Sequence, residues 1–187
     1  MTLSLSDPSF IKGLSTIAKH DPERVYGVFE QRTLTFGDLD CQSEALAACL
    51  RYELGVKAGE RVAVMTTNSP EAIAVLFALA KAGIIWVPVN ARQRGAGLKY
   101  ILEHSAPSLV IVDSDLASVI GECGADLPCM LRLGGEADEV TTLLGSGGKL
   151  DAPAPSMSDA YALMYTSGTT GKPKGAQVTQ AMMTYPP

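Results

Sequence analysis

The segment from Ile84 to Val89 constrains the fold most strongly, because its residues, Ile-Ile-Trp-Val-Pro-Val, are all apolar. A strand with one face in water alternates apolar and polar side chains. A strand of a parallel sheet is covered by helices on both faces, so it is apolar throughout. The segment therefore predicts a strand buried inside a parallel sheet.

Strands and helices alternate along much of the chain. Helices are indicated by apolar residues three to four positions apart, and by local start signals such as Ser69 followed by Pro70. Such alternation produces βαβ units, so the predicted fold class is α/β with a layered sheet. The predicted elements, in chain order, are a hairpin (25–29 and 33–36), a helix from 35 to about 55, a strand (61–66), a helix (70–83), the apolar strand (84–89), a helix (98–105), a strand (109–112), a short helix (116–120) and a strand (161–165).

Length and composition fit one globular domain. The 187 residues are 47% hydrophobic and 19% charged, which excludes disorder as a description of the whole chain. Residues 1–20 are expected to be an N-terminal lead-in. Residues 145–158, rich in Gly, Ser, Ala and Pro, predict a loop.

Charge and hydropathy exclude several partners and compartments. Fifteen basic and 20 acidic residues give a net charge of −5, and the basic residues are scattered, so nucleic acid is not an expected partner. No apolar run approaches the roughly 20 residues needed to span a bilayer. The first residues lack a signal-peptide pattern, so a cytoplasmic location is expected. The four cysteines have no CxxC spacing and are expected to be reduced thiols in the core.

The richest chemical signal lies at 161–175, where an apolar strand, Tyr161 to Tyr165, leads into a loop of small, hydroxyl and lysine residues. Small residues let backbone N–H groups approach a ligand closely, hydroxyls add donors, and lysines add positive charge. This combination suits a polyphosphate. The candidate phosphate-binding residues are Thr166, Ser167, Gly168, Thr169, Thr170, Gly171, Lys172 and Lys174.

Other interpretations of these residues are weaker. The loop lacks Walker A spacing, since Pro173 follows Lys172 where a Ser or Thr is needed. Asp113 after an apolar strand imitates a Walker B acid, but a turn acid is the better interpretation. No nucleophile elbow surrounds Ser167, and His104, like His20, is expected at the surface or a helix cap. Tyr161, Tyr165 and Trp86 are expected to pack in the core.

The run from Tyr165 to Gly175, Tyr-Thr-Ser-Gly-Thr-Thr-Gly-Lys-Pro-Lys-Gly, resembles the phosphate-loop signature of the adenylate-forming enzymes. This superfamily includes acyl- and aryl-CoA synthetases, firefly-type luciferases and the adenylation domains of peptide synthetases. Two weaker blocks, 34–39 and 80–90, agree in order and spacing. The stretch Pro88-Val-Asn-Ala-Arg92 is similar to that of acyl-CoA synthetases, because peptide-synthetase domains more often carry Asp at the position of Asn90.

The resemblance implies a fold and a reaction. Residues 1–187 would be part of the N-terminal, AMP-binding domain, with the C-terminal domain absent and the large domain truncated. A carboxylic acid would react with ATP and magnesium to give an acyl-adenylate and pyrophosphate, and coenzyme A would then accept the acyl group. The loop would enclose the β- and γ-phosphates, Thr166 would contact the magnesium, and Lys174 would add charge. At position 180 the family commonly has His, whereas this chain has Gln180.

Three hypotheses about function follow. The leading one is the N-terminal part of an acyl- or aryl-CoA synthetase that is inactive alone, with no catalytic residue of its own assigned. The second is a module that binds ATP or pyrophosphate weakly through the loop. The third is an interaction fragment that forms a homo-oligomer or pairs with a complementary chain, because an unpaired sheet edge favours association.

Overall fold

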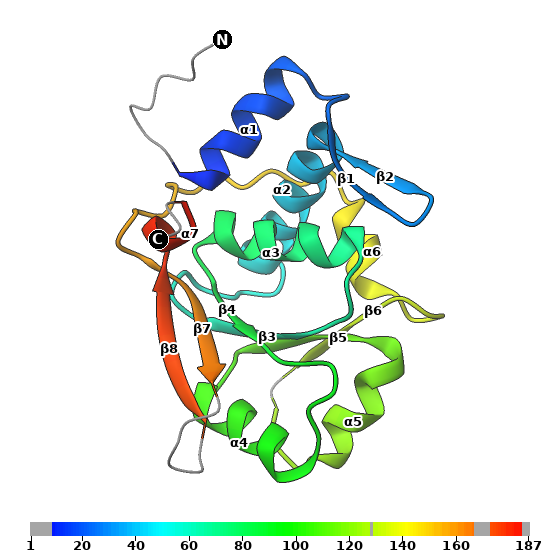
Figure 1. Cartoon of the computed structure of the whole chain (residues 1–187), viewed down its shortest axis with the longest axis vertical. Helices are drawn as coiled ribbons and strands as arrows, with labels where there is room; N and C mark the ends of the chain where they lie inside the picture. Colours follow the sequence, from blue (N-terminus) through cyan, green and yellow to red (C-terminus); the bar gives the residue numbers. More distant parts are fainter. Residues whose placement is uncertain (1–8, 128, 167–172, 185–187) are drawn as a thin grey trace.

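The computed structural model describes residues 9–127, 129–166 and 173–184, and shows a six-stranded sheet with helices on both faces (Figure 1). The strand order is β6-β5-β3-β4-β7-β8, in which β8 runs antiparallel to β7 and the other pairs are parallel. A separate antiparallel hairpin is formed by β1 and β2. The strands are β1 (Val25–Phe29), β2 (Arg32–Thr35), β3 (Arg61–Met65), β4 (Ile85–Pro88), β5 (Leu109–Asp113), β6 (Met130–Leu133), β7 (Ala160–Thr166) and β8 (Lys174–Thr179).

The helices form two layers. In Figure 1, α1, α2, α3 and α6 lie on one side of the sheet, and α4 and α5 lie on the other. The helices are α1 (Phe10–His20), α2 (Phe36–Tyr52), α3 (Pro70–Ala82), α4 (Gly95–Ser105), α5 (Ala117–Glu122), α6 (Glu139–Leu144) and α7 (Gln180–Thr184), with a 3₁₀ turn, η1 (Ser114–Leu116), before α5.

The central strand β3 shows why both layers are needed. Val62 and Val64 pack into the core under α2 and α3, whereas Ala63 and Met65 pack into the core over α4. All four side chains are buried. The prediction of an α/β fold with a two-sided, mostly parallel sheet is therefore confirmed.

The start of α2 and both ends of α3 lie where the local signals predict. The Thr35 hydroxyl accepts the Asp38 N–H at 3.0 Å, and the Asp38 carboxylate accepts the Thr35 N–H at 3.3 Å, which completes a capping box for α2. Ser69 caps α3, with Pro70 in its first turn. Gly83 ends α3 in the left-handed conformation, with φ at 66°.

Within the expected lead-in, residues 10–20 form α1, a helix that the sequence pattern did not predict. Its start is capped by Ser9, whose hydroxyl accepts the Lys12 N–H at 3.2 Å. The sequence pattern does not predict the short elements β6 and α6 either, because four to six residues carry too little periodicity to identify a strand or a helix. Residues 145–159 contain no helix or strand, as expected of the predicted loop.

The prediction of core cysteines holds only for Cys49, which is buried, whereas Cys41 and Cys129 are exposed. Cys41 and Cys49 do share α2, as predicted, but eight residues turn a helix by about 80° beyond two full turns. The two thiols therefore point in different directions. All four cysteines are free.

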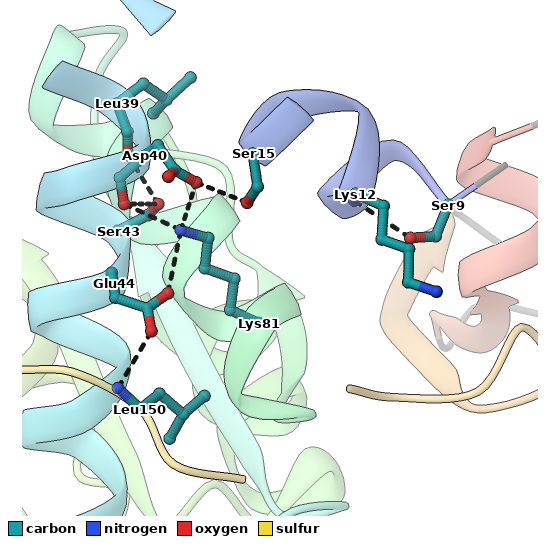
Figure 2. Close-up of polar contacts among 9 residues, drawn as sticks. All are labelled: Ser9, Lys12, Ser15, Leu39, Asp40, Ser43, Glu44, Lys81 and Leu150. Carbon is teal, nitrogen blue, oxygen red and sulfur yellow. Dashed lines mark hydrogen bonds and ion pairs between the residues drawn. The ribbon is translucent and has the colours of Figure 1, made fainter. Parts of the chain in front are cut away.

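A buried ion network joins the helices above the sheet (Figure 2). The Lys81 side chain is 5% exposed, and its ammonium donates to the Asp40 carbonyl and carboxylate oxygens, both at 2.8 Å, and lies 3.2 Å from the Glu44 carboxylate. Asp40 also accepts the Ser15 hydroxyl of α1, and Glu44 accepts the Leu150 N–H of the following loop. One lysine thus links α1, α2, α3 and the 145–159 segment.

Among the residues that the structure describes, no helix is both long and apolar enough to cross a membrane.

Replacing Lys81 tests this network. Lys81→Met should lower the free energy of unfolding by about 2–3 kcal/mol in urea denaturation, because Asp40 and Glu44 lose their shared cation. The expected loss of stability is smaller than that for breaking a fully buried ion pair, because both carboxylates are about one-third exposed. Lys99→Met is the matched control, since its ion pair with Glu103 is exposed and should cost less than about 0.5 kcal/mol. Equal, small effects of the two substitutions would contradict the assigned role of Lys81.

Candidate functional site

The hairpin of β7 and β8 brings together the two ends of the candidate phosphate loop. Thr166 lies opposite Lys174 in the strand register, and Tyr165 lies opposite Gly175. Thr166 and Lys174 are both exposed, so a hydroxyl and an ammonium stand at the same edge. The remaining candidates, Ser167, Gly168, Thr169, Thr170, Gly171 and Lys172, lie outside the described residues.

This edge is where the parallel strands end. The connection after β3 enters α3 on one face, whereas the connection after the adjacent β4 enters α4 on the other face (Figure 1). Connections that diverge in this way leave a crevice at the carboxyl ends of neighbouring strands, where open α/β sheets bind ligands. The end of β7 lies beside this crevice because β7 pairs with β4.

A cavity of about 550 Å³ occupies the crevice. Its wall is apolar near Ile73, Leu76 and Trp86, and it carries hydroxyl and amide groups near the ends of β3, β4 and β7. None of its lining side chains is charged. A ligand here meets apolar surface and neutral hydrogen-bonding groups, and the Lys174 ammonium adds positive charge outside the lining. The lining residues are Val64, Thr66, Thr67, Asn68, Ala72, Ile73, Leu76, Trp86, Pro88, Val89, Asn90, Gln93, Ile101, Met164, Tyr165 and Thr166.

Tyr165 and Tyr161 differ in their surroundings. Tyr161 is buried against Phe10 and Trp86, and burial raises its pKa, so the predicted core role is confirmed. Tyr165 is only half-buried, and its hydroxyl lies 2.7 Å from Nδ1 of His104. Burial also raises the pKa of Tyr165, so its hydroxyl keeps its proton near neutral pH. The sequence predicted His104 as a surface residue, which it is, but gave no sign of this partner.

Asp113 is a turn acid, as predicted. Its carboxylate accepts both the backbone N–H and the hydroxyl of Thr67 at 2.7 Å, which joins the ends of β5 and β3. The carboxylate is therefore engaged in local structure.

Gln180 is the first residue of α7 and is 1% exposed. Neither Nε2 nor Oε1 of its amide has a hydrogen-bond partner among the described residues. An amide cannot ionise, so this position cannot carry a proton as the family's commoner His could.

Comparisons with known proteins were made against families, curated sequences and solved structures. Residues 14–186 match the family described as AMP-binding enzyme. Tyrocidine synthase 3 of Brevibacillus parabrevis is 33% identical over 157 residues, covering 84% of this chain and 2% of that protein. Crotonobetaine/carnitine–CoA ligase of Salmonella paratyphi A is 35% identical over 144 residues, which cover 71% of this chain and 28% of that protein. Among solved structures, the N-terminal subdomain of Klebsiella oxytoca NpsA matches with a TM-score of 0.77 at 28% identity. The match covers 95% of this chain and 43% of that one. The chain thus spans less than half of each relative.

Gly175 offers a test of the hairpin geometry. A Cβ at this position would lie 3.0 Å from Cδ1 of Leu163 and 3.4 Å from Cζ of Tyr165. Gly175→Val should therefore lower the free energy of unfolding by about 1–2 kcal/mol in chemical denaturation. Gly13→Ala in α1 is the control, because a Cβ there meets nothing within 4 Å and helix propensity favours Ala by up to about 1 kcal/mol. A Gly175→Val variant as stable as the unsubstituted chain would contradict the close packing of Tyr165 and Leu163.

Proposed function

Because the chain belongs to the family of AMP-binding enzymes, we propose that it is the N-terminal part of an ATP-dependent acyl- or aryl-CoA synthetase. In this reaction a carboxylate oxygen attacks the α-phosphorus of ATP, the bond to the β-phosphate breaks, and pyrophosphate leaves. The thiol of coenzyme A then attacks the acyl carbon as its proton is lost, and AMP leaves. Activation is needed because a free carboxylate is a poor electrophile.

The observation that carries the proposal is the register of the hairpin, which sets Thr166 opposite Lys174 at the carboxyl edge of the sheet. In the proposal, the residues from Thr166 to Lys172 enclose the β- and γ-phosphates, where hydroxyls and backbone N–H groups donate hydrogen bonds. Lys172 and Lys174 offset the negative charge that grows on the departing pyrophosphate.

The residues present also fit a magnesium ion bound with ATP. The described residues contain no group of three or more His, Cys, Asp or Glu that could hold a metal by themselves. Magnesium commonly keeps several waters and binds substrate phosphates with few protein ligands, so one hydroxyl from Thr166 suits it. Magnesium supplies charge neutralisation on the phosphates when it is bound.

The CoA subclass is supported by the named CoA ligase among the relatives, and by the Pro88-Val-Asn-Ala-Arg92 stretch. The peptide-synthetase relative supports the alternative, an adenylation domain for an amino acid. In the structure, Oδ1 of Asn90 accepts the Arg92 N–H at 2.8 Å. An Asp at this position would accept the same bond, so this contact does not distinguish the subclasses.

A second candidate function is a module that binds ATP or pyrophosphate on its own. It is favoured by the arrangement of the loop ends, which the hairpin brings together without another chain. Association with itself or with a complementary chain is also part of the proposal. It is supported by β8, which forms one edge of the sheet, and by the exposed Met182 and Met183 of α7.

The first test is ATP–pyrophosphate exchange. The chain alone should give no exchange with fatty or aromatic acids, because it spans less than half of each relative and the resemblance implies that the rest of the large domain and the C-terminal domain are also needed. Sustained exchange that depends on the acid would show that the chain is an enzyme by itself, and would overturn its proposed inactivity.

The second test is calorimetry with ATP and magnesium at millimolar concentration. Weak binding is expected, and Lys172→Ala should weaken it roughly tenfold, since a hydrogen bond to a charged group contributes about 1.5–3 kcal/mol. Lys99→Ala is the control, because Lys99 lies on α4 in an exposed ion pair and should leave binding unchanged. The absence of binding heat, together with no effect of Lys172→Ala, would overturn the binding module.

A further inference from the structure

The carboxyl end of β7 extends beyond the registered pairing of this strand with β4. In the described part of the chain, β7 registers with β4 at one position, where Ala162 lies opposite Trp86. Beyond Ala162, the strand pairs only with β8, from Leu163 to Thr166. Because β8 is itself an edge strand, side-chain contacts of β7 beyond Ala162 help to hold the two ends of the candidate phosphate loop against the molecule.

Tyr165 makes such a contact across to the helix layer. Its hydroxyl lies 2.7 Å from Nδ1 of His104, and the His104 ring meets the Tyr165 ring edge-on at 5.7 Å and 89°. The Tyr100 ring stacks against His104 at 5.4 Å and 28°. The imidazole is thus held between two aromatic rings, with one nitrogen directed to the Tyr165 hydroxyl.

The helix that carries His104 is firmly attached. Leu98 and Leu102 of α4 are buried in the core. Arg61 of β3 donates from Nε to the Ser105 carbonyl at 2.5 Å and from Nη2 to the Ala106 carbonyl at 3.0 Å. These bonds fix the end of α4, one to two residues beyond His104, to the central strand. His104 therefore presents its ring from a rigid base.

The Tyr165 ring also contacts the exit strand of the loop. Gly175 lies opposite Tyr165, and a Cβ at Gly175 would come within 3.4 Å of the ring. The ring thus packs over β8 next to Lys174, while its own backbone leads directly into Thr166. Any displacement of Tyr165 would move both loop ends together.

We propose that His104 is a positioning residue for the candidate phosphate site: its bond to Tyr165 fixes Thr166 and Lys174 at the sheet edge. The inference rests on the proposed function for its consequence, which is tighter binding of ATP and magnesium. The positioning itself depends only on the contact between α4 and β7. The two parts can therefore fail separately.

Amide hydrogen exchange on the full chain tests the positioning. His104→Phe keeps an aromatic ring between Tyr100 and Tyr165 but removes the nitrogen, and Tyr165→Phe removes the hydroxyl. Each should speed exchange of the amides of Thr166 and of the facing β8 residues about fivefold, the factor for one hydrogen bond of about 1 kcal/mol. Amides of β3 and β5 should not change.

Three further variants sharpen the test. The double variant, His104→Phe with Tyr165→Phe, should exchange no faster than either single variant, because both remove the same bond. His104→Asn provides an oxygen near the place of Nδ1 and should restore slow exchange. His20→Phe is the matched control, since His20 is exposed at the end of α1, away from β7.

The outcomes separate the two parts of the proposal. Unchanged exchange at the β7 and β8 amides in both single variants would overturn it, as would faster exchange throughout β3 and β5, which indicates a general loss of stability. Faster local exchange together with a three- to tenfold weaker affinity of His104→Phe for ATP and magnesium would support it fully. Faster local exchange in a chain that binds no ATP would support the positioning and overturn its proposed consequence, which is binding of ATP and magnesium by the chain alone.

Discussion

The central strands of the sheet must be covered on both faces, and the rest of the structure depends on this requirement. Val62 and Val64 of β3 bury one face while Ala63 and Met65 bury the other, so helices are needed above and below. Supplying both layers from one chain forces the connections after β3 and β4 to leave in opposite directions. The crevice at the carboxyl edge is therefore a consequence of burying apolar surface.

The hairpin of β7 and β8 adds a different kind of element to this edge. A parallel strand, β7, carries the chain back to the crevice, and the antiparallel β8 pairs with it, so Thr166 and Lys174 lie opposite each other near the cavity. The side-chain contacts of Tyr165 then add to the pairing of β7 with β8, beyond the registered pairing with β4. The Lys81 network likewise connects α1, α2 and α3 above the sheet through side-chain contacts.

Local signals predicted the elements well, whereas contacts between distant residues could not be predicted. The Thr35 capping box, the Ser69-Pro70 start and the Gly83 stop each depend on residues a few positions apart. The assignment of the loop residues to phosphate binding rests on their chemistry and stays a prediction, and the structure sets only Thr166 and Lys174 opposite each other. The His104 and Tyr165 pair, 61 residues apart, arises only when α4 packs against the sheet. The sequence shows Gln180 where the family commonly has His, but the burial of Gln180 depends on packing around α7.

The strand order also determines when the candidate site can form as the chain folds. A hairpin such as β7 and β8 closes in about 1–10 μs because its strands are neighbours in sequence. The contact between Trp86 and Ala162 spans more of the chain than any other registered strand pair in the described sheet. Such distant pairing must first overcome the entropy of closing a long loop. We therefore expect the loop ends to meet each other before they reach the crevice.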